Sequence, residues 1–351
     1  MGPVSAFIKW GVIGTFVAGV LVFAQALEVG DVTGLLQVGE VSELRPIIEE
    51  QLGEIPLADG PGHDGQIFYA IGLDLSGSET ATLLDHGTYR YRRILYPAVA
   101  SLGGVLDGHA LLYSMITLAV VSMGLAAGAI AAMAVRFDRS EWFALAVILN
   151  PGIWLSVRLL TADITALAAM GLGLLAVVSG WRYVAALLAA SVLAKDVYLL
   201  SPAGLMVHRE TRRWTWFIVP AAALAMWSTY LTLVLEGGFS GGQANFSWPF
   251  QGIVRSVPLW STFDGGDLLY LSFALASVIV GLIYGVLRPG WLRWPIVFWS
   301  FLGLVSSNSV WDFGNNAARA FAPIVVLIGA AEVSRSRNVT GVREHEQQRR
   351  S

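Results

Sequence analysis

A succession of long apolar segments is the feature of this sequence that most restricts its fold. A helix needs about 20 apolar residues to cross the hydrocarbon core of a bilayer. Charged residues make up only 13% of the chain, against about a quarter in soluble domains, so they are too few to cover a water-exposed surface. We therefore predict an all-α polytopic membrane protein. The apolar segments run approximately over 7–26, 109–135, 142–157, 163–180, 184–206, 215–235, 268–287, 295–308 and 317–333.

The charges between these segments predict which side of the membrane each linker faces. Short cytoplasmic linkers are enriched in arginine and lysine. The arginine-rich linkers are 136–139, 208–213, 288–293 and the tail from residue 335. We expect these on the cytoplasmic side of the cell membrane. The linkers expected outside are 28–108, 236–267 and 309–316.

One apolar segment, 184–206, carries Lys195 and Asp196 in its middle. Charges at that depth are costly in lipid, and a single helix here would put two arginine-rich linkers on opposite sides. A hairpin of two short helices that turns at Lys195–Asp196 removes both conflicts. An extra span at 94–107 would also restore the parity. We prefer the hairpin, which gives about ten membrane helices with both termini cytoplasmic.

The chain shows no division into separate domains. We expect one membrane domain over residues 1–333 and a disordered cytoplasmic tail over 334–351. The first apolar segment closes with Ala24-Gln25-Ala26, which resembles a signal-peptidase site. A retained first span and a cleaved signal peptide both place the following residues outside, and we favour the retained span.

Composition excludes several classes of function. A net charge of −3 without a basic arm argues against a nucleic-acid partner, and the absence of cysteine rules out disulfides and thiolate metal sites. P-loop, HExxH and GxSxG motifs are missing. The histidines show no ligand spacing, so we predict no metal site; the sequence leaves the cofactor open, and a divalent cation is not excluded. They are His63, His86, His109, His208 and His345.

The strongest candidate for chemistry lies in the long first loop, where Gly62-His63-Asp64-Gly65-Gln66 precedes a short helix predicted over 67–74. Glycine on both sides of the His-Asp pair permits a tight turn and close approach to a ligand. The sequence allows two interpretations of Asp64. It is a cap for the helix that follows, or it is a general base or metal ligand.

The second candidate is the run Tyr89-Arg90-Tyr91-Arg92-Arg93, which leads into a short helix expected over 93–106. Cations at an outer membrane end run against the usual bias. Arginine forms forked bonds to phosphate and stacks on aromatic rings. The run therefore indicates either a binding site for a lipid phosphate or simple anchoring to headgroups.

Three further groups of charges border the expected outer side. Arg158 and Asp163 lie at the mouth between two spans and could pair with each other. Lys195 and Asp196 are functional candidates because of their depth, or a structural ion pair. Arg319 begins the last span and could reach the same external cavity.

Two stretches resemble the polytopic GT-C glycosyltransferases, particularly bacterial members with "DGQ-aromatic-aromatic" and "YRYRRILYP" patterns. Here these read Asp64-Gly65-Gln66-Ile67-Phe68-Tyr69 and Tyr89 to Pro97. The stretch Leu193-Ala194-Lys195-Asp196 is similar to that group's "L-[AT]-K-[ED]" element. The motifs cover about a tenth of the chain, whereas the order of one span, a long outer loop and many spans covers nearly all of it.

The resemblance implies an inverting hexosyltransferase, mannosyltransferase-like, that moves a sugar from a polyprenyl phosphate to a glycan or lipid acceptor of the cell envelope. Asp64 would be the catalytic base, with short loop helices along the membrane surface. Many members carry two adjacent acidic residues at this point. Here His63 precedes Asp64, which puts metal binding in doubt.

A lipid phosphate leaving group needs fixed cations nearby. The candidates are Arg90, Arg92, Arg93, Lys195 and Arg319. Among them we favour Arg92 or Arg93 together with Lys195. The auxiliary candidates are His63, Gln66, Tyr69, Asp163 and Asp196. Two other classes of function stay open. A transporter or flippase of a lipid-linked or anionic substrate would line its pathway with the same charges, and a non-catalytic scaffold of envelope synthesis would tolerate the loss of Asp64.

Overall fold

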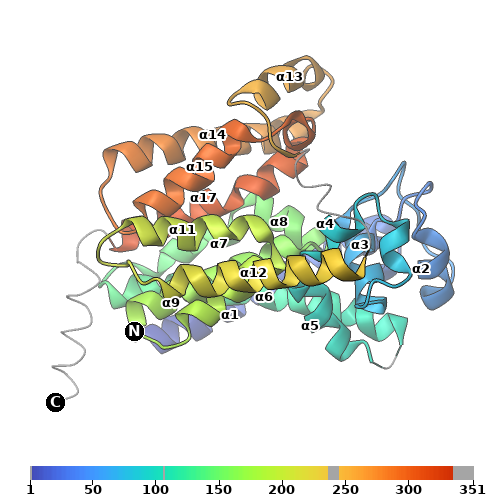
Figure 1. Ribbon diagram of the computed structural model, residues 1–351, viewed down its shortest axis with the longest axis horizontal. Coiled ribbons are helices and arrows are strands. Elements are labelled where there is room, and N and C mark those ends of the chain that lie inside the picture. The colour runs from blue at the N-terminus through green and yellow to red at the C-terminus, as the bar shows by residue number, and fades with distance from the viewer. Residues whose placement is uncertain (1, 106, 236–244, 335–351) are drawn as a thin grey trace.

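A computed structural model describes residues 2–105, 107–235 and 245–334, and Figure 1 shows that these segments form a helical bundle. The predicted disordered tail therefore lies almost entirely outside the described residues. The α-helices are α1 (Pro3–Val29), α2 (Arg45–Leu52), α3 (Asp64–Leu73), α4 (Gly87–Tyr91), α5 (Leu95–Gly103), α6 (Gly108–Arg136), α7 (Leu145–Ile148), α8 (Pro151–Arg158), α9 (Ala162–Ser179), α10 (Val184–Ala194), α11 (Leu200–Val207), α12 (Thr215–Val234), α13 (Gln251–Trp260), α14 (Gly265–Leu287), α15 (Arg293–Val305), α16 (Asn308–Trp311) and α17 (Gly314–Ser334). The 3₁₀ helices within the described residues are η1 (Val32–Leu36), η2 (Thr80–Leu83), η3 (Glu141–Ala144) and η4 (Asp196–Leu199).

Six of the described helices are long and apolar enough to cross a membrane. They are α1, α6, α9, α12, α14 and α17. Shorter apolar helices cover 184–194, 196–207 and 293–305. The prediction of a helical membrane protein is therefore confirmed at this level, and the count of about ten membrane helices remains a prediction.

Small residues bring the first span against α6. A Cβ on Gly14 would lie 3.0 Å from the Cα of Gly124, and a Cβ on Gly124 would lie 2.5 Å from the carbonyl oxygen of Gly11. Such close backbone approach is the usual basis of helix pairing in lipid. The opposite face of α1 exposes Ile8, Phe16 and other large apolar side chains. The helix continues unbroken through residues 24–26, and the retained first span stays a prediction.

The segment predicted as one span over 142–157 is divided into η3, α7 and α8. The break lies at Asn150, whose side chain accepts hydrogen bonds from the backbone N–H groups of Gly152 and Ile153 and so caps α8. Its Nδ2 also donates to the carbonyl of Ala322 in α17, at 3.1 Å. Proline at the next position suits the first turn of the new helix, because its missing N–H would have had no partner there.

Ion pairs show that this divided segment runs the full length of α1. Glu141 at its start pairs with Lys9, and Arg158 at its end pairs with Glu28 at 3.1 Å. We call the end of the bundle that carries residues 31–105 the loop end. Glu28 and Arg158 lie at that end, and Lys9 and Glu141 lie at the opposite end.

The 184–206 segment is interrupted where the sequence carries its charges. Lys195 lies between α10 and η4 and pairs with Asp163 at the loop-end start of α9. His208, after α11, lines a pocket with Arg288 and Ser334 at the opposite end. The chain therefore reaches the loop end at Lys195 and returns, as the predicted hairpin requires. The nine-residue α5 is too short for the alternative extra span at 94–107.

The first loop is folded at the end of the bundle. In Figure 1 its helices α2 to α5, coloured blue to cyan, gather at the right-hand end of the long helices, away from the N-terminus. Two of its helices, α3 and α5, correspond to the short helices predicted over 67–74 and 93–106. Their buried side chains, including Phe68, Tyr69 and Tyr96, belong to the same apolar core as the spans. The loop therefore holds its polar groups at fixed positions above the bundle.

Candidate functional site

The side chain of Asp64 faces a cavity of about 830 Å³ at the loop end. The walls come from the turn before α3, from the segment before α4 and from the start of α17. His63, Arg90, Asn316 and Arg319 line it with Asp64. Segments far apart in the sequence thus meet around one carboxylate, which has 20% of its side chain exposed.

Backbone contacts fix the turn that presents Asp64. Gly62 adopts a φ of +75°, and a Cβ there would lie 2.3 Å from the carbonyl oxygen of Gln37. Only glycine fits this position without strain. Gln66 holds the same turn from the helix side, since its Nε2 donates to the carbonyl of Pro61 at 2.7 Å and its Oε1 accepts from the N–H of Gly39 at 3.4 Å.

Gly65 serves a different purpose. A Cβ there would lie 2.9 Å from the carbonyl oxygen of Leu159, so this position lets α3 pack directly against the backbone that follows α8. In the Asp-Gly-Gln triplet, the aspartate therefore faces the cavity, the glycine allows α3 to pack closely against the backbone after α8, and the glutamine holds the turn by hydrogen bonds.

Asp64 does not cap the helix it begins. The N-cap residue of α3 is His63, and no side chain caps the helix. Instead, the Asp64 carboxylate accepts hydrogen bonds from Arg90 Nη1 at 3.1 Å and from Arg319 Nη2 at 3.3 Å. The capping interpretation is therefore wrong, although a carboxylate in the first turn still interacts favourably with the helix dipole.

These two guanidinium groups control the charge of Asp64. Burial alone would raise the pKa of the carboxyl, but Arg319 and Arg90 outweigh burial and hold the pKa of Asp64 well below its usual range. Burial lowers the pKa of His63, and the nearby Arg319 lowers it further. The site therefore carries an ionised carboxylate beside a neutral imidazole at neutral pH.

Asp85 orients Arg90. Its carboxylate accepts from Arg90 Nε and Nη2, both at 2.9 Å, in a forked pair. This hydrogen-bonded pairing with Arg90 lowers the pKa of Asp85. Sequence reasoning did not single out Asp85 as a site residue, because nothing in its neighbourhood distinguishes it from the other acids of the loop.

The arginine–tyrosine run is divided between the site and the scaffold. Tyr91 is buried, donates from its hydroxyl to the carbonyl of Asp74 at 2.6 Å, and accepts at its own carbonyl from Trp227 of α12 at 2.8 Å. Tyr96 donates to the carbonyl of Met115 at 3.1 Å. These tyrosines attach the loop to the spans.

Arg93 is buried and lies over the ring of Tyr89, 4.8 Å from its centroid. It also donates to the Tyr89 hydroxyl. Asn245, from the segment before α13, donates to the same hydroxyl at 2.9 Å. No sequence signal identified Asn245, because its contact depends on two segments 156 residues apart.

A second charged pair lies behind the first. Lys195 pairs with Asp163 in the interior, and the hydroxyl of Tyr198 donates to the backbone carbonyl of Asp163 at 3.2 Å. Arg93 interacts electrostatically with Asp64, Asp163 and Asp196 and so connects the two groups.

Two pairings that the sequence left open are absent among the described residues. Arg158 does not pair with Asp163; its Nε donates to Gln25 and its Nη2 pairs with Glu28. Lys195 pairs with Asp163 in place of its neighbour Asp196. In both cases helix packing, and not adjacency in sequence, determines which charges face each other.

The structure brings most of the sequence candidates together and leaves two aside. His63, Asp64, Gln66, Arg90 and Arg319 line the cavity, with Arg93, Asp163, Lys195 and Asp196 linked to Asp64 directly or through Arg93. Tyr69 is fully buried, with its hydroxyl near the position of Gly108, and Arg92 is partly buried outside the residues that line the cavity.

The donors around Asp64 do not suit a divalent cation. Such ions prefer several oxygen ligands, whereas both oxygens of this carboxylate already accept from guanidinium groups. Among the described residues, no group of three or more histidine, aspartate or glutamate side chains is arranged to hold a metal ion.

Comparison with known proteins adds no relative. The chain matches no family model, no curated protein and no solved structure.

Proposed function

We propose that this chain is a membrane glycosyltransferase that moves a sugar from a polyprenyl-phosphate donor to an acceptor hydroxyl of the cell envelope. One observation carries the proposal: an ionised carboxylate, Asp64, faces a large cavity beside two guanidinium groups. Such a site offers a proton acceptor and an anion-binding group a few ångströms apart. The resemblance of the Asp64 and Tyr89–Pro97 stretches to GT-C enzymes supports the same reading.

The reaction divides naturally among these groups. The acceptor oxygen forms a bond to the anomeric carbon, the bond from that carbon to the phosphate oxygen breaks, and the polyprenyl phosphate leaves with the electron pair. The acceptor proton passes to Asp64, a role that contributes typically about 10²–10⁴-fold. Arg90 and Arg319, in place of the Arg92 or Arg93 and Lys195 favoured from the sequence, stabilise the charge that develops on the phosphate, because these two line the cavity with Asp64.

Binding of the donor would also activate the base. A carboxylate held at low pKa by two arginines is a weak base, because its charged form is already stabilised. When a phosphate takes hydrogen bonds from Arg90 and Arg319, Asp64 loses part of that stabilisation and its pKa rises. The carboxylate therefore becomes more basic in the complex than in the free protein.

The orientation follows from where the cations lie. The arginine-rich linkers 208–213 and 288–293 border one pocket at the end opposite the loop, and Arg136 ends α6 at that same end. Positive charge favours the cytoplasmic side. We therefore place the loop end and its cavity outside, with the start of α1 and the end of α17 inside.

The test is a transfer assay on the full chain in lipid, with a panel of radiolabelled polyprenyl-phosphate sugars and membrane extract as acceptor. We expect transfer by the wild type and a loss of at least about a hundredfold in Asp64→Asn. Asp59→Asn is the matched control, because Asp59 lines the same cavity and is exposed.

The outcomes separate the classes of function. Equal transfer by Asp64→Asn and wild type would remove Asp64 from the mechanism. No transfer by the wild type over the whole panel, with the fold intact, would contradict the proposal that the protein is an enzyme and would favour a transporter or a scaffold.

A further inference from the structure

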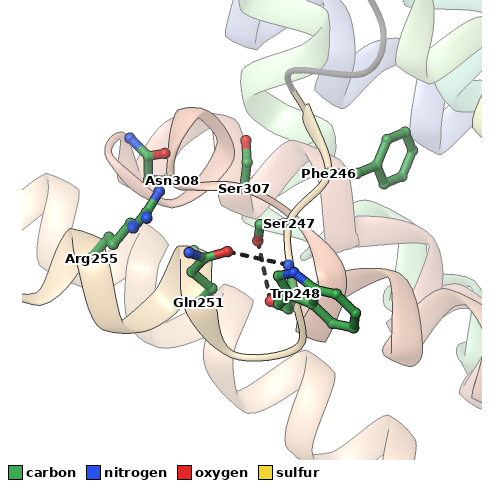
Figure 2. Close-up of a pocket in the computed structure, with 8 residues that line it drawn as sticks. Phe246, Ser247, Trp248, Gln251, Arg255, Ser307 and Asn308 are labelled. Carbon is green, nitrogen blue, oxygen red and sulfur yellow. Dashed lines mark hydrogen bonds between the residues drawn. The ribbon is translucent and has the colours of Figure 1, made fainter.

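A second pocket, of about 490 Å³, lies away from Asp64 between α13, the segment before it and the start of α16. Figure 2 shows its polar side chains together with Trp248. Ser247, Gln251, Arg255, Ser307 and Asn308 supply hydroxyl, amide and guanidinium groups. The proposed transfer reaction uses none of them.

Among the described residues that line this pocket, Arg255 is the only cation. It is exposed, and no carboxylate pairs with it within the described ranges. In Figure 2 its guanidinium points toward Asn308. The Asn308 amide donates to Asp312 at 2.8 Å, and the Oε1 of Gln251 accepts from the N–H of Trp248 at 3.3 Å. These bonds hold the amide side chains beside a cation that lacks a counterion.

The pocket is built on a fixed frame. Ser247 N–H donates to the carbonyl of Val305 at 2.8 Å. A Cβ on Gly252 would lie 2.1 Å from the carbonyl oxygen of Ser306, so α13 packs directly on that backbone. Ser256 donates to Asp312 at 2.7 Å. The pocket therefore exists before any ligand binds.

The surroundings of the pocket are apolar and exposed. Trp248 is 80% exposed, and Val254 and Val257 on α13 are 66% and 51% exposed. The helix lies in the connection between α12 and α14, both long enough to cross the membrane. Figure 1 shows α13 at the edge of the bundle, beyond α14. Exposed aromatic and aliphatic groups beside a cation, next to two spans, are typical of an interfacial helix.

We propose that this pocket binds the phosphate group of a membrane phospholipid, with α13 lying in the bilayer interface. Arg255 and the Gln251 amide donate to the phosphate oxygens, and Val254, Val257 and Trp248 contact the upper part of the acyl chains. A charge-assisted bond from arginine suits this anion. The apolar rim selects a lipid over a free phosphate, because a soluble anion would leave that surface exposed to water. This proposal does not depend on the transfer reaction.

Native mass spectrometry of the full chain tests the binding. The purified protein is titrated with phosphatidylglycerol, with dioleoylglycerol, which lacks the phosphate, and with glycerol 3-phosphate, which lacks the chains. We expect phosphatidylglycerol adducts on the wild type and about tenfold weaker binding for Arg255→Gln. Arg45→Gln is the matched control, since Arg45 lies in the loop and pairs with Glu49.

Three outcomes would overturn the binding proposal. These are equal retention of phosphatidylglycerol by Arg255→Gln and Arg45→Gln, equal retention of dioleoylglycerol and phosphatidylglycerol by the wild type, and displacement of the lipid by glycerol 3-phosphate at the same concentration. A folded Arg255→Lys variant with intermediate retention would support the phosphate contact, because lysine keeps the charge and loses the fork.

The position of α13 is tested with single thiols, because the chain contains no cysteine. Val257→Cys and Glu50→Cys each receive a nitroxide label in phosphatidylglycerol bilayers, and relaxation by oxygen is compared with relaxation by a water-soluble nickel complex. We expect Val257 to favour oxygen and Glu50, exposed on α2, to favour nickel. Equal preference for nickel at both positions would place α13 in water and overturn the proposal.

Discussion

Asp64 and Asp163 lie at the same end of the bundle, and each pairs with cations. Asp64 shares Arg90 and Arg319, and 20% of its side chain is exposed to a cavity. Asp163 pairs with Lys195 and is 9% exposed inside the bundle. The chemistry of the two groups is alike, and their accessibility differs. In the proposed function the carboxylate that meets the cavity receives the acceptor proton, whereas the enclosed one pairs with Lys195 between α9 and the turn after α10.

The largest difference between Asp64 and Asp163 should appear in the stability of variants that lose each carboxylate. Asp163→Asn leaves Lys195 buried without its counterion, and breaking a buried ion pair costs about 3–5 kcal/mol. Asp64→Asn should cost less, about 1–3 kcal/mol, because Arg90 keeps Asp85, whereas Arg319 loses its carboxylate and keeps only the Asn316 amide. Equilibrium unfolding in mixed micelles measures both. Similar losses for the two variants would mean that accessibility does not separate their roles.

The second prediction concerns pH and applies to Asp64. Its folded pKa is depressed, so the stabilisation it gives is present above the unfolded pKa and is lost as pH falls through the folded pKa. Arg319→Gln removes the charge that lowers the pKa of Asp64 most strongly. The loss of stability on acidification, which we call the acid limb, should therefore occur at higher pH in this variant. Thermal unfolding from about pH 1 to 6, which covers the usual range of carboxyl titration and the depressed range below it, follows the shift.

A matched substitution controls for a general loss of charge. Arg45→Gln also removes one arginine, but Arg45 pairs with Glu49 and is not among the charges that lower the pKa of Asp64. The stability of this variant should therefore fall over the same acid range as that of the wild type. If Arg319→Gln and Arg45→Gln titrate alike, Arg319 does not set the charge of Asp64.

The smallest predicted effect concerns Asn245, which contacts the residues around Asp64 through Tyr89. Asn245→Ala removes the bond to the Tyr89 hydroxyl and the bond accepted from Ser309. We expect a loss of about 1 kcal/mol, typical of one or two neutral hydrogen bonds. The shift of the acid limb in Arg319→Gln should persist in this background. A loss above about 3 kcal/mol would show that Asn245 anchors the whole loop.

Much of the fold was predictable because it rests on local properties of the chain. The apolar segments marked the six long helices. The charges at Lys195–Asp196 marked the interruption between α10 and α11, since such groups are costly within a continuous span. The division at Asn150 was not predicted, although an asparagine followed by proline is a helix-start signal.

The candidate site was predictable in part. Glycines around Asp64 indicated a tight turn, and Gly62 does adopt a positive φ. The partners of Asp64 were harder to find, because Arg319 lies 255 residues away. The contributions of Asp85 and Asn245 had no local signal, because a side chain among many similar ones is distinguished only by what packs against it.

The sequence by itself determined that this chain forms apolar helices of membrane-spanning length, and that a folded polar loop follows the first of them. Both follow from composition and spacing, which act over a few turns of helix. The tertiary structure decided which charges meet: Asp64 with Arg90 and Arg319, and Asp163 with Lys195. Ion pairs form where helix packing brings their ends together, and that packing depends on contacts along the whole chain.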